Sequence, residues 1–171
     1  MKCVYCVILC MALVVDDVPA QEAVEQIAEL KHGPLKEVSG ITRSSYAGVF
    51  WVHNDSGDEA RIFAINLDGE PVIPPFMRPR FVDRVWPGVA VLNAWNVDWE
   101  DITFANGRLF IAEMGNNGNA RRDLGVYELA EPNPCAVDRT RAVRFLPVRY
   151  PDQNAYPGVN WQFDCEAFWS G

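Results

Sequence analysis

Three short acidic segments recur along the 171-residue chain and combine carboxylates with apolar residues. They are Glu37–Ile41, Asp98–Ile102 and Asp164–Phe168, and they begin 61 and then 66 residues apart (37 to 98, 98 to 164). Each places a polar or acidic side chain two positions before an aliphatic or aromatic one. Because carboxylate oxygens are the ligands that Ca²⁺ and Mg²⁺ prefer, the pattern predicts a divalent-cation site wherever folding gathers these segments.

The stretches between these segments have the patterns of strands and turns. A first unit contains predicted strands at Val38–Arg43, Val49–His53, Arg61–Asn66 and, more weakly, Val89–Ala94, with Ile41 expected to be buried. A second unit contains predicted strands at Glu100–Ala105, Arg108–Met114, Leu124–Ala130 and Ala142–Tyr150. Asn106-Gly107 is the preferred pair for a two-residue type I′ hairpin. Phe163–Phe168 is expected to open a third unit.

A repeat of this length built only from strands predicts an all-β fold of the β-propeller kind. The expected blades are residues 37–97 and 98–163, each with four antiparallel strands, followed by the start of a third blade at 164–171. A closed propeller needs about four to eight blades, so we expect the chain to be an N-terminal fragment of an incomplete propeller. The alternative is a small β-sandwich complete in about 150 residues.

The N-terminus has the pattern of a secretory signal peptide over residues 1–20. Lys2 is followed by the apolar run Val4–Val15, and Val18-Pro-Ala20 offers small residues for cleavage. The run is shorter than the roughly 20 residues needed to span a bilayer. We therefore expect a secreted or periplasmic protein with no integral membrane segment after signal removal. The alternative is a buried N-terminal strand or helix. Residues 21–36 would form a short helix over 21–32 or an edge strand at Ile27–Leu30.

Composition limits the partners. The net charge of −8 and the scattered basic residues argue against nucleic acid, and 49% hydrophobic residues argue against disorder. Removing residues 1–20 leaves Cys135 and Cys165, which would either pair or remain free thiols. The chain has no CxxC motif or Cys/His cluster, so the sequence predicts no zinc, and it predicts no nucleotide cofactor. A small molecule or a glycan is the expected ligand.

Several motifs together resemble a family of secreted bacterial propeller proteins, most of them uncharacterised. They are Ser39-Gly40-Ile41, Trp51–Asp58, Asn96–Ile102, Gly115–Asn117 with Ala120–Arg122, and Phe163–Ala167. These proteins are similar in layout to six-bladed propellers of the phytase-like, gluconolactonase-like and TolB-like groups. The resemblance covers roughly residues 27–169 and implies divalent cations in or near the central channel.

Antiparallel alternation brings the start of each first strand and the loop joining the second and third strands to one side of the sheet. The candidate metal ligands at this rim are Asp98, Glu100, Asp164, Glu166 and Asn54. The candidate ligand-binding residues are Asp55, Asp58, Glu113, Asn116, Asn117, Arg121 and Arg122. Glu100, Glu166 and His53 are the candidates for catalysis. The oxygen-rich set favours Ca²⁺ as cofactor.

Structural roles are open for the same residues. Acidic and Asn side chains often cap turns, the arginines are placed to pair with Asp123 or Glu128, and His53 fits a structural role. Trp51, Trp99 and Phe110 fit the core. The sequence therefore favours a secreted ligand-binding propeller with a divalent cation at the channel rim. The alternative is a metal-dependent hydrolase of a phosphoester or lactone when the chain is full length.

Overall fold

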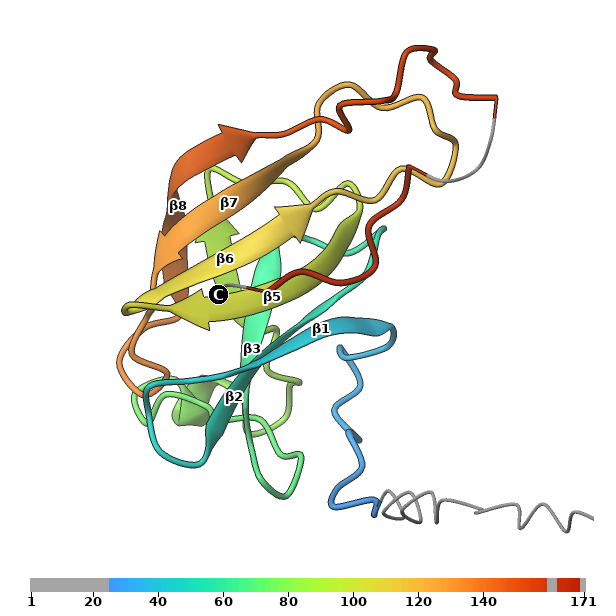
Figure 1. The fold of residues 1–171 in the computed structure, drawn as a ribbon. Helices are drawn as coiled ribbons and strands as arrows, with labels where there is room; N and C mark the ends of the chain where they lie inside the picture. The colour runs from blue at the N-terminus through green and yellow to red at the C-terminus, as the bar shows by residue number, and fades with distance from the viewer. Residues whose placement is uncertain (1–24, 160–162, 170–171) are drawn as a thin grey trace, which may run out of the picture.

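The structure is a computed structural model that describes residues 25–159 and 163–169. Within them the chain is all-β, as predicted (Figure 1). Its elements are β1 (Val38–Arg43), β2 (Val49–Asn54), β3 (Arg61–Asn66), the 3₁₀ helix η1 (Arg78–Arg80), β4 (Val89–Leu92), β5 (Trp99–Ala105), β6 (Arg108–Glu113), β7 (Gly125–Ala130) and β8 (Arg139–Pro147). The predicted signal peptide lies outside the described residues.

The strands form one mixed eight-stranded sheet in the order β1-β2-β3-β4-β8-β7-β6-β5. The units β1–β4 and β5–β8 are each antiparallel throughout, and a parallel β4–β8 pair joins them. At the other end of the order, β1 packs beside β5, so the sheet nearly closes into a barrel (Figure 1). The sequence did not predict the β4–β8 pair.

Local patterns produced most strands where the sequence predicted them. The β5–β6 hairpin turns at Asn106 and Gly107 with φ of 51° and 74°, the left-handed conformation that a type I′ turn requires. The expected strand at residues 163–168 is absent, because residues 163–169 form no ladder with a neighbour. The expected helix or edge strand of the N-terminal segment is also absent from residues 25–32.

The main core lies between the two units. Trp51 and Trp99 are both fully buried in it, together with Ile62 and Leu109 from the facing units. A smaller cluster of Leu35, Val52, Phe63 and Ile65 covers the outer face of the first unit. Trp51 and Trp99 therefore have the expected core positions, whereas Phe110 is only half-buried. The main core therefore fills the interior of the nearly closed sheet.

The same irregularity occurs in the first strand of each unit. In β1 the register shifts between Val38 and Gly40, and in β5 it shifts between Trp99 and Asp101. Each shift leaves one extra residue, which is Ser39 in β1 and Glu100 in β5, as in a β-bulge. A bulge changes the alternation of side chains that follows it. Ile41 pairs with Val52 and so shares the outer face of the first unit, where it is 58% exposed rather than buried as the sequence predicted.

Gly40 allows β1 to approach β5 closely. A Cβ atom at this position would lie 2.6 Å from His53 Nε2, 2.7 Å from Ile102 N and 2.9 Å from Asp101 Cα. The Ser39 hydroxyl donates a hydrogen bond to the Glu100 carbonyl oxygen across the same junction. The absence of a side chain at Gly40 thus sets the spacing between the two units.

Two further predictions concern single features of the chain. Cys135 and Cys165 are free thiols, so the alternative without a disulfide is the one observed. No helix in the described part of the chain is long and apolar enough to cross a membrane.

Candidate cation site

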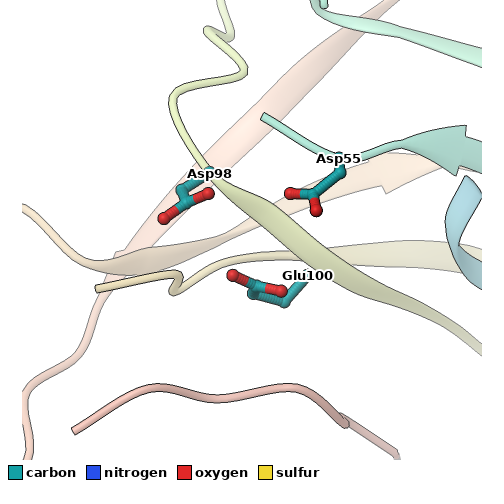
Figure 2. A group of neighbouring side chains, drawn as sticks. All are labelled: Asp55, Asp98 and Glu100. Atoms are coloured by element: carbon teal, nitrogen blue, oxygen red, sulfur yellow. The ribbon is translucent and has the colours of Figure 1, made fainter. Parts of the chain in front are cut away.

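Three carboxylates from different segments converge beside the β1–β5 junction. Asp55 follows β2, Asp98 precedes β5 and Glu100 occupies the β5 bulge. One ligand oxygen from each can be chosen so that all three lie within 4.8 Å of one another. Figure 2 shows the three side chains directed toward a common space. This arrangement brings together two residues predicted as metal ligands, Asp98 and Glu100, with one predicted as ligand-binding, Asp55.

A second group of three shares Glu100 with the first. Its other members are Asp164 and Glu166, whose oxygens lie within 4.8 Å of one another and of Glu100. The 163–169 segment is held here by three backbone amides. They are Phe163 N–H to Asn119 Oδ1 (3.0 Å), Asn116 N–H to Asp164 Oδ1 (2.5 Å) and Phe168 N–H to Asp101 Oδ2 (2.8 Å). We call Asp55, Asp98, Glu100, Asp164 and Glu166 the acidic rim.

The bulge explains how Glu100 reaches the rim. In a regular strand, successive side chains alternate between the two faces, and Trp99 already points into the core. The extra residue is not paired on β6, because Trp99 pairs with Glu113 and Asp101 pairs with Ala112. The bulge therefore redirects one carboxylate without disturbing the rest of the ladder.

Gly115 forms the wall behind two of the carboxylates. A Cβ atom added to it would lie 2.2 Å from both Asp98 Cγ and Glu100 Oε1. Any side chain at this position would therefore displace both groups. The Gly115 N–H also donates to the Asp98 carbonyl oxygen at 3.1 Å, which fixes the loop against the start of β5.

The electrostatics of the rim are dominated by burial and like charge. Burial, followed by the nearby Glu166, Asp98, Asp55 and Asp164, raises the pKa of Glu100 to about 8. Burial also raises the pKa of Asp98, although a hydrogen bond from Asn117 opposes the shift. Among the described residues, no Lys or Arg forms an ion pair with a carboxylate of the rim.

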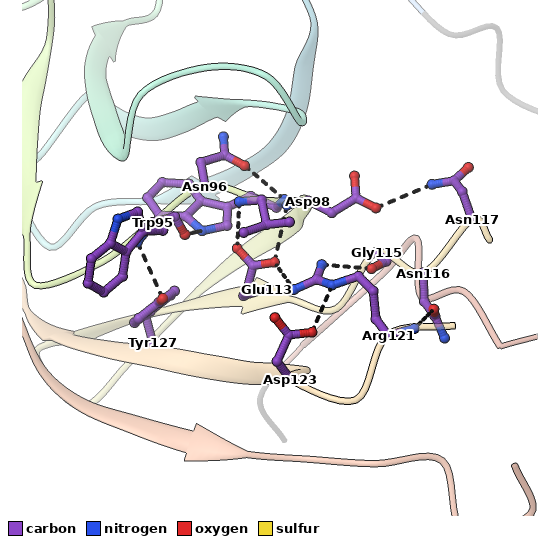
Figure 3. A network of polar contacts seen from close by, with 12 residues as sticks. Trp95, Asn96, Asp98, Glu113, Gly115, Asn116, Asn117, Arg121, Asp123 and Tyr127 are labelled. Atoms are coloured by element: carbon purple, nitrogen blue, oxygen red, sulfur yellow. Dashed lines mark hydrogen bonds and ion pairs between the residues drawn. The ribbon is translucent and has the colours of Figure 1, made fainter. Parts of the chain in front are cut away.

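A neighbouring network of hydrogen bonds and ion pairs holds the backbone at Asp98 in place (Figure 3). Buried Glu113 accepts hydrogen bonds from the N–H groups of Val97 (3.0 Å) and Asp98 (3.1 Å). Arg121 pairs with Glu113 at 2.6 Å and with Asp123 at 3.2 Å. It also donates to the Gly115 carbonyl at 2.8 Å. Arg121 and Glu113, which were predicted to bind ligand, are thus engaged with each other and with the backbone.

The remaining predicted residues lie around the rim in other roles. Asn54 donates to the Pro34 carbonyl and to Asp58, and Asp58 pairs with Arg61 at 2.5 Å. Asn54, a predicted metal ligand, makes these contacts through its amide N–H₂ group, and its Oδ1 accepts a hydrogen bond from Lys36 N–H at 3.1 Å.

The other loop residues contact protein groups as well. Asn116 accepts a hydrogen bond from Arg121 N–H at 2.9 Å, and the Asn117 amide lies 3.4 Å from Asp98 Oδ2. The Arg122 guanidinium stacks over Tyr156 at 4.2 Å.

His53 is enclosed beside the junction. Its side chain is 0% exposed, and its ring lies edge-on to Trp99 with centroids 5.5 Å apart. Nδ1 lies 2.9 Å from the Asn54 carbonyl. Burial lowers the pKa of His53, although this carbonyl opposes the shift. A neutral, buried imidazole packed on a tryptophan is in the structural environment that the sequence left as an alternative.

Sequence reasoning missed Gly115 and Tyr150. The Tyr150 ring packs on Phe163 with centroids 5.5 Å apart, and its hydroxyl is buried without a hydrogen-bond partner among the described residues. Burial, followed by Cys165 and Asp164, raises the pKa of Tyr150 to about 12. Neither residue lies in an acidic segment, so no local signal connects it with the rim.

The fold and the acidic rim define an all-β protein with an oxygen-rich cluster. Comparison of the chain with protein-family models, with curated proteins and with solved structures finds no match.

Proposed function

We propose that this protein binds a divalent cation, Ca²⁺ in the first place, at the acidic rim and uses the ion to hold a small molecule or a glycan. The observation that carries the proposal is the environment of Glu100. This side chain is 3% exposed, yet in the described part of the chain its carboxylate has neither a hydrogen-bond donor nor a cationic partner. Four other carboxylates surround it instead.

The size of the repulsion supports a cation. Two like charges about 4–5 Å apart repel by about 3–4 kcal/mol at an effective dielectric constant of about 20. A divalent ion between them converts this repulsion into attraction. Ca²⁺ accepts about six to eight oxygen ligands, so protein carboxylates would leave positions for water or for hydroxyl and carboxylate oxygens of a ligand.

We further propose that the two units correspond to two propeller blades. Three features support this interpretation: both units are antiparallel with four strands, their first strands carry the same bulge, and β1 lies beside β5. The 163–169 segment is attached to β5 and to the loop that follows β6, and we propose that it corresponds to the start of a third blade. The parallel β4–β8 pair departs from the propeller arrangement, because it joins the outer strands of the two units. We also propose that residues 1–20 act as a signal peptide that directs export of the protein.

The cation proposal is tested by titrating the full chain with Ca²⁺ and following its thermal unfolding. Binding to the native state raises the unfolding temperature, and the rise grows with the ratio of the Ca²⁺ concentration to the dissociation constant. Glu100→Gln keeps the shape of the side chain and should abolish the Ca²⁺-dependent rise. Asp68→Asn, in an exposed turn away from the rim, is the matched control and should preserve it. If Glu100→Gln bound Ca²⁺ as tightly as the wild type, the proposed site would be wrong.

A metal-dependent hydrolase acting on a phosphoester or lactone is the second proposal, and Tyr150 favours it. Its buried hydroxyl has no hydrogen-bond partner among the described residues and retains its proton at neutral pH, so it is available as a donor to a bound ligand. Turnover of generic phosphoester and lactone substrates in the presence of Ca²⁺ distinguishes the two functions. Ca²⁺ binding without turnover supports the binding protein.

A further inference from the structure

The acidic rim is divided into two groups rather than gathered around one point. Asp55, Asp98 and Glu100 form one group, and Glu100, Asp164 and Glu166 form the other. Among the described residues, no group combines Asp55 with Asp164 or Glu166. Oxygens bound to one Ca²⁺ each lie about 2.3–2.6 Å from the ion, so they must lie within about 5 Å of one another. The grouping therefore provides two centres, each with three carboxylates.

Glu100 is the side chain common to both centres, and its environment is a separate observation. It is 3% exposed, and no described residue donates a hydrogen bond to its carboxylate or pairs with it. In each of the two groups, an oxygen of Glu100 lies within 4.8 Å of the ligand oxygens of the other two members. A carboxylate has two oxygens and can bind two cations at once. A buried carboxylate with no partner in the described part of the chain, placed between two acidic groups, has the position of a bridging ligand.

The charge of the rim is consistent with two ions. One divalent ion neutralises two of the negative charges that the five carboxylates carry when ionised, and two ions neutralise four. The Arg121 guanidinium is engaged with Glu113 and Asp123 rather than with the rim. Added cations or bound protons would therefore compensate the charge that the described protein groups leave.

We propose that the acidic rim holds two divalent cations of the Ca²⁺ class, bridged by Glu100. This inference rests on the proposed cation-binding function. The first ion is bound by Asp55 and Asp98, and the second is bound by Asp164 and Glu166. Carboxylate-bridged pairs of metal ions typically lie about 3.5–4 Å apart, which a single bridging side chain accommodates.

The second ion has a structural consequence that the first lacks. Asp164 and Glu166 belong to the 163–169 segment, which forms no strand and is held by a few hydrogen bonds to Asn116, Asn119 and Asp101. A cation shared by this segment and Glu100 fastens it to β5. Occupation of the second centre should therefore slow amide hydrogen exchange in residues 163–169.

The number of Ca²⁺ ions per chain tests the proposal, measured by titration calorimetry on the full chain. The wild type should bind two ions. Asp55→Asn and Asp164→Asn should each bind one, and Glu100→Gln should weaken both sites at least tenfold. Asp68→Asn should still bind two. Hydrogen exchange should separate the two single variants, because only Asp164→Asn loses the Ca²⁺-dependent protection of residues 163–169.

The outcomes distinguish this inference from the function on which it rests. A wild-type stoichiometry of one ion, lost equally on changing Asp55 or Asp164, would overturn the two-ion arrangement and leave a single cation site intact. No Ca²⁺ binding by the wild type would overturn both proposals. The wild-type stoichiometry needs no variant, so it decides the question even where a substitution prevents folding.

Discussion

The two four-stranded units share a backbone plan and differ in what they place on it. Both first strands carry a bulge at the same point of the register, at Ser39 in β1 and at Glu100 in β5. The first unit uses its bulge residue to hydrogen-bond the Glu100 carbonyl. The second unit uses its bulge residue to bring a buried carboxylate to the acidic rim. The same local geometry thus provides a structural contact in one unit and a candidate ligand in the other.

The outer faces of the units differ in the same way. In the first unit, Val52, Phe63 and Ile65 form an apolar cluster that the preceding segment partly covers. In the second, Glu128 is 2% exposed and pairs with Arg108 at 2.6 Å and with Arg144. A buried carboxylate with two guanidinium partners contrasts with Glu100, which has none among the described residues. This contrast is the reason that we propose a cation at Glu100 and a stabilising role for Glu128.

The largest expected effect on stability comes from a substitution at the contact between the two units. Gly40→Ala should destabilise the protein by about 3 kcal/mol, because its Cβ atom would meet His53 and the β5 backbone within 3.0 Å. Gly33→Ala is the control, since nothing lies within 4 Å of its added Cβ atom. Urea unfolding measures both variants. Equal stability of the two would mean that β1 and β5 do not approach as described.

A substitution at Gly115 tests whether this loop of the second unit positions Asp98 and Glu100 for cation binding. Gly115→Ala should lower Ca²⁺ affinity about 10- to 100-fold, because its Cβ atom displaces Asp98 and Glu100 while every carboxylate remains. Gly118→Ala, in the same loop, has open space around its added Cβ atom and should bind normally. Titration calorimetry compares the pair. An unchanged affinity in Gly115→Ala would place the ion elsewhere.

The two bulge residues should separate stability from binding. Ser39→Ala removes one hydrogen bond to the Glu100 carbonyl and should cost about 1 kcal/mol of unfolding free energy. Its Ca²⁺ affinity should stay within about twofold of the wild type, because the carboxylate of Glu100 is retained. Unfolding and calorimetry on the same preparation measure both quantities. A large loss of affinity would show that Ser39 belongs to the binding site.

Glu131 links the units and should contribute a small, pH-dependent stability. Its carboxylate accepts hydrogen bonds from Ser44, Ser45 and the Trp51 indole of the other unit. Although burial opposes the shift, these bonds lower the pKa of Glu131 from its usual 4.5. The stabilisation is therefore present above pH 4.5 and lost as the pH falls through the lower folded-state value.

Glu131→Gln should remove this part of the pH dependence and cost less than about 1 kcal/mol at neutral pH, since the group is partly exposed. Urea unfolding from pH 7 down to pH 3 measures the difference between wild type and variant. If the variant and the wild type lost stability in parallel below pH 4.5, Glu131 would not be the group responsible.

The sequence predicted strands well where the signal is local. The limits of β1 and β3 agree with the prediction, and the Asn106-Gly107 turn has the expected conformation, because alternation and turn propensity involve only neighbouring residues. It failed for Ile41, which lies with Val52 on the outer face of the first unit and is 58% exposed, because a local pattern does not tell which face the rest of the fold covers. It also failed for residues 163–168, because a strand needs a partner that a local pattern does not supply.

The site divides in the same manner. The spacing of the acidic segments predicted that Asp98, Glu100, Asp164 and Glu166 would meet, and the structure brings them into two groups around Glu100. Asn54 stays a predicted ligand, and its amide group donates hydrogen bonds to Pro34 and Asp58. The acidic segments contain no signal for Gly115, whose role depends on which side chains approach it.

By itself, the sequence of this protein determined its all-β character, its two similar units and the presence of carboxylates at their starts. These properties follow from patterns only a few residues long. The tertiary structure decided which carboxylates share one space, which arginines neutralise others, and that Glu100 is buried with no partner among the residues that the structure describes. Burial and charge pairing join residues far apart in the chain, so only the packed fold determines them.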